Sequence, residues 1–131
     1  ADVDLAADLA PQEALKMIRA LAGKGFRPQV PVSAEMFADP AVREEWFQEK
    51  HMRAFSLVDP TNPMRVIDLL LKPEVPFEEL LARSQEAFVG GTSVRVASLG
   101  DLITLKRHAG RPQDLADIKE LEAIRNRKGG R

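Results

Sequence analysis

The residues best suited to chemistry in this chain are carboxylates placed among apolar neighbours. Asp68 interrupts the aliphatic run 65–71, which Pro63 and Pro73 bound. A short apolar run of this kind predicts a strand that is buried on both faces. An ionised carboxylate is costly in such a strand unless a cation pairs with it. Either Asp68 therefore lies at the exposed end of its strand, or a metal ion or basic group lies over it.

A second acidic motif stands at the start of the chain, where Asp2-Val3-Asp4-Leu5 alternates polar and apolar residues. As a strand, its period of two places Asp2 and Asp4 on the same face. Two carboxylates on one face repel each other, and a divalent cation bound between them removes that cost. The alternative interpretation is a frayed acidic terminus.

Charged groups also gather around the segment 106–117. Lys106 lies close to the apolar face of a predicted helix, so its stem is expected to follow the core towards one end. Arg111 can reach Asp114 in the following turn with two parallel hydrogen bonds. Asp114 and Asp117 are one turn apart on a single helix face. This corner is either part of a functional site or a salt-bridge network that locks two helices together.

The elements that must position these residues follow from periodicity and from capping signals. Asp39-Pro40 and the Ser98-x-x-Asp101 capping box predict helix starts, and Gly110 predicts a helix end. The dense turn 59–63 predicts that the strand carrying Asp68 returns antiparallel to the strand before it. We expect helices over 11–22, 40–50, 77–83, 102–108 and 112–125, and strands over 2–6, 26–32, 52–58, 64–71, near 88 and over 93–97.

The same patterns predict which side chains enter the core. Proline confines the strand 26–32 to an edge or to an irregular position of the sheet. In the helix 40–50, Val42 and Trp46 are expected to face inward, whereas Arg43 belongs to a solvated charged face. The last helix is expected to bury a stripe formed by Leu115, Ile118, Leu121 and Ile124.

Composition limits the class of protein. The chain has 131 residues, 44% of them apolar and 30% charged, which is typical of one soluble globular domain. Its net charge of −1 provides no basic field that would recruit nucleic acid or a membrane. Cysteine is absent, which excludes disulfides and fits a cytoplasmic location. We expect a single domain over residues 1–131, no membrane partner, and a frayed basic tail over 126–131.

Taken together, the Asp2-x-Asp4 motif, the lone strand residue Asp68 and the corner segment 101–118 resemble the polymerase-β-type nucleotidyltransferase superfamily. The nearer resemblance is to its small prokaryotic members, which are related to abortive-infection toxins and minimal nucleotidyltransferases. It extends over nearly the whole chain. The resemblance implies an α/β (α+β) fold in which helices flank a mixed, largely antiparallel central sheet, with a helix pair at the C-terminal end.

The resemblance also implies roles for individual residues. Asp2, Asp4 and Asp68 would be the metal ligands, binding Mg²⁺ or Mn²⁺ around a nucleoside triphosphate. Asp68 would also serve as general base towards the acceptor hydroxyl, which requires a reach of ~3 Å. The catalytic set would be Asp68, Lys106 and Asp114, and the nucleotide-binding cations Lys106 and Arg111.

The implied activity is magnesium-dependent transfer of a nucleoside monophosphate from a triphosphate to a hydroxyl on RNA, a protein or a small molecule. The family places a Gly-Gly or Gly-Ser turn before the D-x-D motif, whereas this sequence starts at that motif. We therefore expect either the C-terminal part of a longer protein or a degenerate form of the fold, with a homodimer or a partner chain as ways to complete the sheet. The alternatives are a non-catalytic domain for nucleotide sensing or protein interaction, and an ordinary α/β domain with acidic surface residues.

Overall fold

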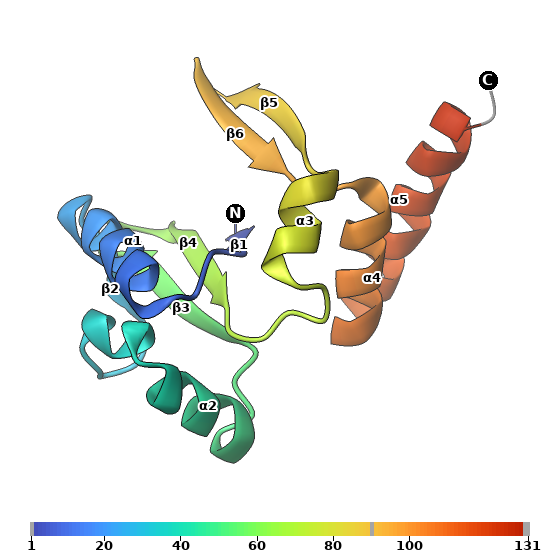
Figure 1. Cartoon of the computed structure of the whole chain (residues 1–131). Coiled ribbons are helices and arrows are strands. Elements are labelled where there is room, and N and C mark those ends of the chain that lie inside the picture. Colours follow the sequence, from blue (N-terminus) through green and yellow to red (C-terminus); the bar gives the residue numbers. More distant parts are fainter. Residues whose placement is uncertain (1, 90, 130–131) are drawn as a thin grey trace. The chain divides into compact units, whose positions relative to one another are not determined.

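The computed structural model describes the backbone of residues 2–89 and 91–129, and the side chains of these residues except 2, 89, 128 and 129. The chain forms two compact units, Ala1–Pro73 and Glu74–Arg131. The elements of the first unit are β1 (Asp2–Leu5), α1 (Pro11–Gly23), β2 (Arg27–Pro28), the 3-10 helix η1 (Ala34–Ala38), α2 (Pro40–Glu49), β3 (Ala54–Asp59) and β4 (Asn62–Leu70) (Figure 1). Those of the second are α3 (Phe77–Arg83), β5 (Gln85–Val89), β6 (Thr92–Val96), α4 (Leu99–Ala109) and α5 (Pro112–Gly129).

The first unit is built on a four-stranded sheet with the order β1-β4-β3-β2. β1 runs parallel to β4, whereas β3 is antiparallel to both of its neighbours. The predicted fold class, a mixed and largely antiparallel sheet with helices, is confirmed. The predicted edge position of the strand that contains Pro28 is also confirmed, because β2 pairs only with β3 in the described sheet.

Alternate residues of this sheet enter the core of the first unit. Phe55, Leu57 and Leu69 are almost completely buried and pack against side chains from α1, η1 and α2. Trp46 of α2 stacks on Phe55, with a distance of 4.9 Å between the ring centroids. Along β4, Asp68 is only half-buried beside the buried Leu69. The prediction of a strand buried on both faces is therefore wrong, because β4 belongs to an antiparallel pair in which only every second residue enters the core.

Arg43 is a second departure from the sequence-based expectation. Its side chain is buried, and its guanidinium donates to the backbone carbonyls of Phe37 at 2.5 Å and Leu9 at 2.9 Å. It also lies over the ring of Phe37, 5.5 Å from the centroid. The expectation of a solvated Arg43 was wrong. Two backbone carbonyls from separate segments accept hydrogen bonds from its guanidinium, and these bonds offset the free-energy cost of burying the charge.

The second unit combines the hairpin β5–β6 with three helices. The predicted helix start at Ser98 is confirmed, since the Asp101 backbone N–H donates to the Ser98 hydroxyl at 3.1 Å, while the Asp101 carboxylate accepts from Arg83. Gly110 ends α4 in the left-handed conformation with a φ of 66°, as its position predicted. α5 continues to Gly129, beyond the expected end at Arg125. No helix within the described ranges is both long and apolar enough to cross a membrane.

The inward face of α5 differs from the predicted stripe. Leu115 is 50% exposed, whereas Asp114 is fully buried and Ile118 nearly so. The expectation for Leu115 was wrong because a carboxylate occupies the position that hydrophobic periodicity assigns to an apolar side chain. Asp114 can do so because Lys106 and Arg111 neutralise its charge.

Candidate functional site

The first unit carries a row of polar residues across three strands. Asp4 of β1 is the register partner of Asp68 in β4, and Asp68 is in turn the partner of Ser56 in β3. Neighbouring strands lie about 4.8 Å apart, and register partners point to the same face of a sheet. In each strand a residue adjacent to the polar one points the other way: Leu69 and Phe55 belong to the buried core cluster, and Leu5 packs against it. The polar row therefore lies on the face opposite to that core.

The contacts of Asp68 are those of a fixed carboxylate. The Ser56 hydroxyl donates a hydrogen bond to Oδ1 of Asp68 at 2.5 Å. Asp68 is half-buried and Asp4 is exposed, so a ligand can reach Asp4 from solvent. Like charges directly opposite each other on neighbouring strands are destabilising. A cation that binds to both carboxylates would remove this repulsion.

Asp2 is placed by its backbone only. It is the register partner of Val66, two residues before Asp68, and its side chain lies outside the described residues. Among the side chains that are described, no group of three His, Cys, Asp or Glu residues is arranged to hold a metal ion. The described candidate ligands are thus Asp4 and Asp68. Two carboxylates suffice for Mg²⁺, which keeps several waters and completes its shell with substrate phosphates.

In the second unit, Asp114 is the centre of a charged network between α4 and α5. Its carboxylate accepts from Nε of Arg111 at 2.7 Å and from Nη2 at 3.2 Å, which confirms the predicted pair of parallel hydrogen bonds. Nζ of Lys106 lies 3.6 Å from Oδ1 of Asp114 and 3.0 Å from Oδ2 of Asp117. The corner therefore joins the two helices through ion pairs, whatever further role its residues have.

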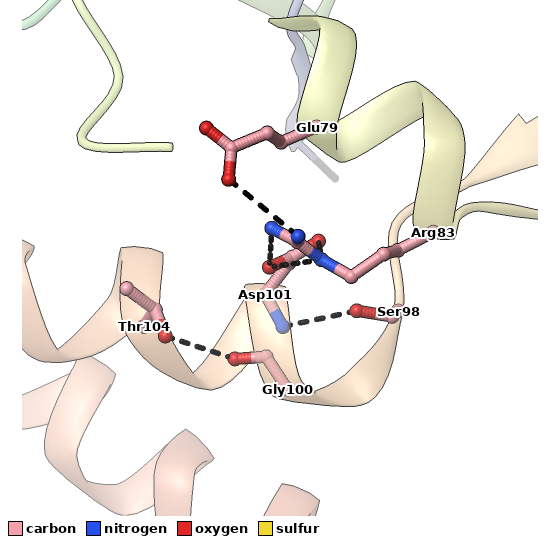
Figure 2. Close-up of polar contacts among 6 residues, drawn as sticks. All are labelled: Glu79, Arg83, Ser98, Gly100, Asp101 and Thr104. Carbon is pink, nitrogen blue, oxygen red and sulfur yellow. Dashed lines mark hydrogen bonds and ion pairs between the residues drawn. The ribbon is translucent and has the colours of Figure 1, made fainter. Parts of the chain in front are cut away.

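A second network in this unit joins α3 to the start of α4 (Figure 2). Nε of Arg83 donates to Oδ2 of Asp101 at 3.0 Å, and Nη2 donates to Oδ1 at 2.9 Å. On its other side, Arg83 forms an ion pair with Glu79 at 3.6 Å. Asp101 is buried, so its carboxylate depends on this guanidinium rather than on water.

Both buried carboxylates have lowered pKa values. Hydrogen bonds from Arg111 hold the pKa of Asp114 below its ordinary value, against the effect of burial, which raises it. Hydrogen bonds from Arg83 lower the pKa of Asp101 in the same way, again against burial. Each group is therefore ionised in the folded protein at neutral pH, as an ion-paired carboxylate must be.

These lowered pKa values predict acid sensitivity of the second unit. A carboxylate whose pKa is lower in the folded than in the unfolded state stabilises the fold above the unfolded pKa of about 3.9, and this contribution is lost as the pH falls through the folded pKa. Thermal unfolding followed by circular dichroism should show a smaller loss of stability between pH 5 and pH 3 in Asp114→Asn than in the wild type. The half-exposed Asp117→Asn serves as the matched control. Equal losses in the wild type and Asp114→Asn would contradict this role of Asp114.

Three contact residues were missed from the sequence, namely Ser56, Arg43 and Arg83. The sequence does contain a signal for Ser56. The short turn between β3 and β4 fixes the register of these antiparallel strands, and this register places Ser56 opposite Asp68. No local signal existed for the other two. The Arg43 bond to Leu9 spans 34 residues, and the bond from Arg83 to Asp101 spans 18 residues.

The predicted site residues are divided between the two units. Asp2, Asp4 and Asp68 belong to Ala1–Pro73, where the structure places Asp4 beside Asp68. The other predicted residues belong to Glu74–Arg131, where the structure brings all three together at one corner: Lys106, Arg111 and Asp114.

Comparison with known proteins identifies the family. The family model described as "Nucleotidyl transferase of unknown function (DUF2204)" matches residues 26–131, about four fifths of the chain. The match includes Asp68 and the corner of α4 and α5, whereas Asp2 and Asp4 precede it. No curated protein and no solved structure matches the chain. The chain therefore belongs to this family of nucleotidyl transferases of unknown function.

Proposed function

We propose that the chain is a catalytic nucleotidyltransferase domain of the polymerase-β type, which transfers a nucleoside monophosphate from a nucleoside triphosphate to a hydroxyl group. The observation that carries this proposal is the pair of carboxylates, Asp4 and Asp68, side by side on adjacent strands of a nucleotidyl transferase family member. Their oxygens are the hard ligands that Mg²⁺ and Mn²⁺ prefer. When bound, such an ion supplies positive charge against the charge that develops on the phosphate oxygens.

The residues of the site have separate tasks in this reaction. Asp2, Asp4 and Asp68 would hold the cation. The oxygen of the acceptor hydroxyl forms a bond to the α-phosphorus, while the bond from this phosphorus to the β-phosphate oxygen breaks and pyrophosphate leaves. The proton of the acceptor hydroxyl passes to Asp68, which acts as general base. RNA, a protein side chain and a small molecule are the proposed classes of acceptor.

We also propose that the corner of α4 and α5, taken by itself, binds phosphate. Lys106 and Arg111 carry the positive charge for this task, and Asp114 holds both of them. We also propose that the chain is related to the small prokaryotic nucleotidyltransferases that are linked to abortive-infection toxins. A cytoplasmic location, and assembly as a homodimer or with a partner chain, are part of the same proposal.

The activity is tested by incubation of the protein with labelled nucleoside triphosphates and Mg²⁺, with and without total RNA. We expect a labelled acceptor that depends on Mg²⁺, and we expect no label with Asp68→Ala. Label on RNA, on the protein itself or on a small molecule identifies the class of acceptor, and the absence of any labelled acceptor would contradict the proposal. Equal labelling by Asp68→Ala would reject the proposed site.

A second candidate function is a non-catalytic domain that senses a nucleotide or binds a protein. The engagement of Lys106 and Arg111 by carboxylates favours it, because a cation held at 3.0 Å or less by protein carboxylates has less charge to offer a phosphate. Isothermal titration calorimetry with a triphosphate separates the two. Mg²⁺-dependent binding that is lost in Asp68→Asn and weakened in Lys106→Met supports the catalytic proposal, whereas binding independent of both Mg²⁺ and Asp68 supports the sensing domain.

A further inference from the structure

We infer that Ser56 is a positioning residue, which orients the Asp68 carboxylate for cation binding. The inference rests on the proposed function and adds a residue to it. Ser56 lies on β3, the strand on the opposite side of β4 from Asp4. The polar row therefore has a hydrogen-bond donor at one end and a carboxylate at the other, with Asp68 between them.

The contact has the geometry of a strong, charge-assisted hydrogen bond. The distance of 2.5 Å between Oγ of Ser56 and Oδ1 of Asp68 is at the short end for a hydroxyl bonded to a carboxylate. A serine hydroxyl has a single proton to donate. Because this proton is directed at Oδ1, the bond fixes one oxygen. We assign Oδ2 to the cation or to the proton of the acceptor, since no described side chain donates to it.

The neighbouring strand explains why Asp68 needs such a contact. Asp4 is its register partner on β1, and repulsion between the two ionised groups would turn the Asp68 side chain away from the row. The neighbours of Asp68 along β4 on the same face are apolar, namely Val66 and Leu70. The Ser56 hydroxyl on the neighbouring strand β3 lies on the same face and stabilises the Asp68 carboxylate. Hydrogen bonds that orient a ligating carboxylate typically change metal affinity or activity by 10–100-fold.

The experiment measures Mn²⁺ binding to the protein alone by electron paramagnetic resonance, together with kcat and KM for nucleotidyl transfer. We expect Ser56→Ala to weaken Mn²⁺ binding and lower kcat, each by roughly 10–100-fold. Ser56→Thr retains a hydroxyl on a strand and should recover most of both. The matched control is Ser93→Ala, since Ser93 is an exposed strand residue of the hairpin β5–β6.

The outcomes separate this inference from the proposed function. Binding of Mn²⁺ that Asp68→Asn abolishes and Ser56→Ala leaves unchanged would overturn the role of Ser56 alone. Wild-type protein that binds no Mn²⁺ would overturn the proposed function, and the role of Ser56 with it. If Ser56→Ala loses Mn²⁺ binding and activity and Ser56→Thr does not recover them, the result would also contradict a role for the hydroxyl group.

Discussion

Asp68→Asn is expected to leave the fold intact and to lower the rate of nucleotidyl transfer by about 10³-fold or more, because a single general base contributes 10²–10⁴-fold. The asparagine amide has the same shape but carries no negative charge and accepts no proton. Its Oδ1 can still accept the hydrogen bond from Ser56, so the row on the sheet keeps its packing. The measurement is kcat/KM for the labelled triphosphate at saturating Mg²⁺, with fluorescence of Trp46 as the check on folding.

The matched control for this variant is Asp8→Asn. Asp8 is exposed in the loop after β1, and its Oδ1 accepts from the backbone N–H of Ala10 at 3.0 Å, a bond that asparagine preserves. We expect wild-type activity from it. An Asp68→Asn protein as active as Asp8→Asn would show that Asp68 takes no part in the chemistry.

The second large effect is expected at Arg43, where methionine should lower the free energy of unfolding of the first unit by about 3 kcal/mol. The Arg43→Met side chain fills a similar volume but leaves the carbonyls of Leu9 and Phe37 without their buried donor, and each unsatisfied buried group costs about 1–3 kcal/mol. Trp46 is the single tryptophan of the chain and stacks on Phe55 in the core of this unit. Urea unfolding followed by its fluorescence therefore reports on the first unit specifically.

The control for Arg43→Met is Arg19→Met, since Arg19 is exposed on α1. Surface substitutions of this kind usually change stability by less than about 0.5 kcal/mol. Arg43→Lys is an intermediate variant, because one ammonium cannot reproduce the planar fork that reaches two carbonyls. If Arg43→Met and Arg19→Met unfold at the same urea concentration, the two hydrogen bonds of Arg43 contribute nothing to stability.

The bond from Arg43 to Leu9 also matters for the proposed site. Leu9 lies between β1, which carries Asp4, and α1. A buried side chain of α2 thereby holds the segment that follows β1. This connection depends on residues 34 positions apart, so no local pattern of residues could reveal it.

Local chemistry predicted much of the architecture. Asp39 caps α2 by accepting from the Ala41 backbone N–H at 2.9 Å, and Ser98 and Gly110 mark the ends of α4. The short turn after Asp59 made the antiparallel pairing of β3 and β4 predictable. The bond between Arg111 and Asp114 was predictable for the same reason, because the two residues are one helical turn apart. In each case the interacting groups are close in sequence, so few conformations compete.

Burial was predicted less well where charged residues are concerned. Periodicity assigned Leu115 to the core and Arg43 to solvent, and both assignments were wrong. Asp114 and Arg43 are buried because specific partners satisfy their charges, and the identity of those partners depends on how separate segments pack. Hydrophobic patterns carry no information about such partners.

The sequence by itself determined the family and where its carboxylates stand along the strands, because alternation and motif spacing are properties of neighbouring residues. Only the tertiary structure decided that β1 lies parallel to β4 with Asp4 beside Asp68, and that Ser56 completes the row. The packing of the whole core determines which strands pair when they are far apart in the chain. In this core, α1, η1 and α2 cover one face of the sheet. That packing places the two acidic strands side by side.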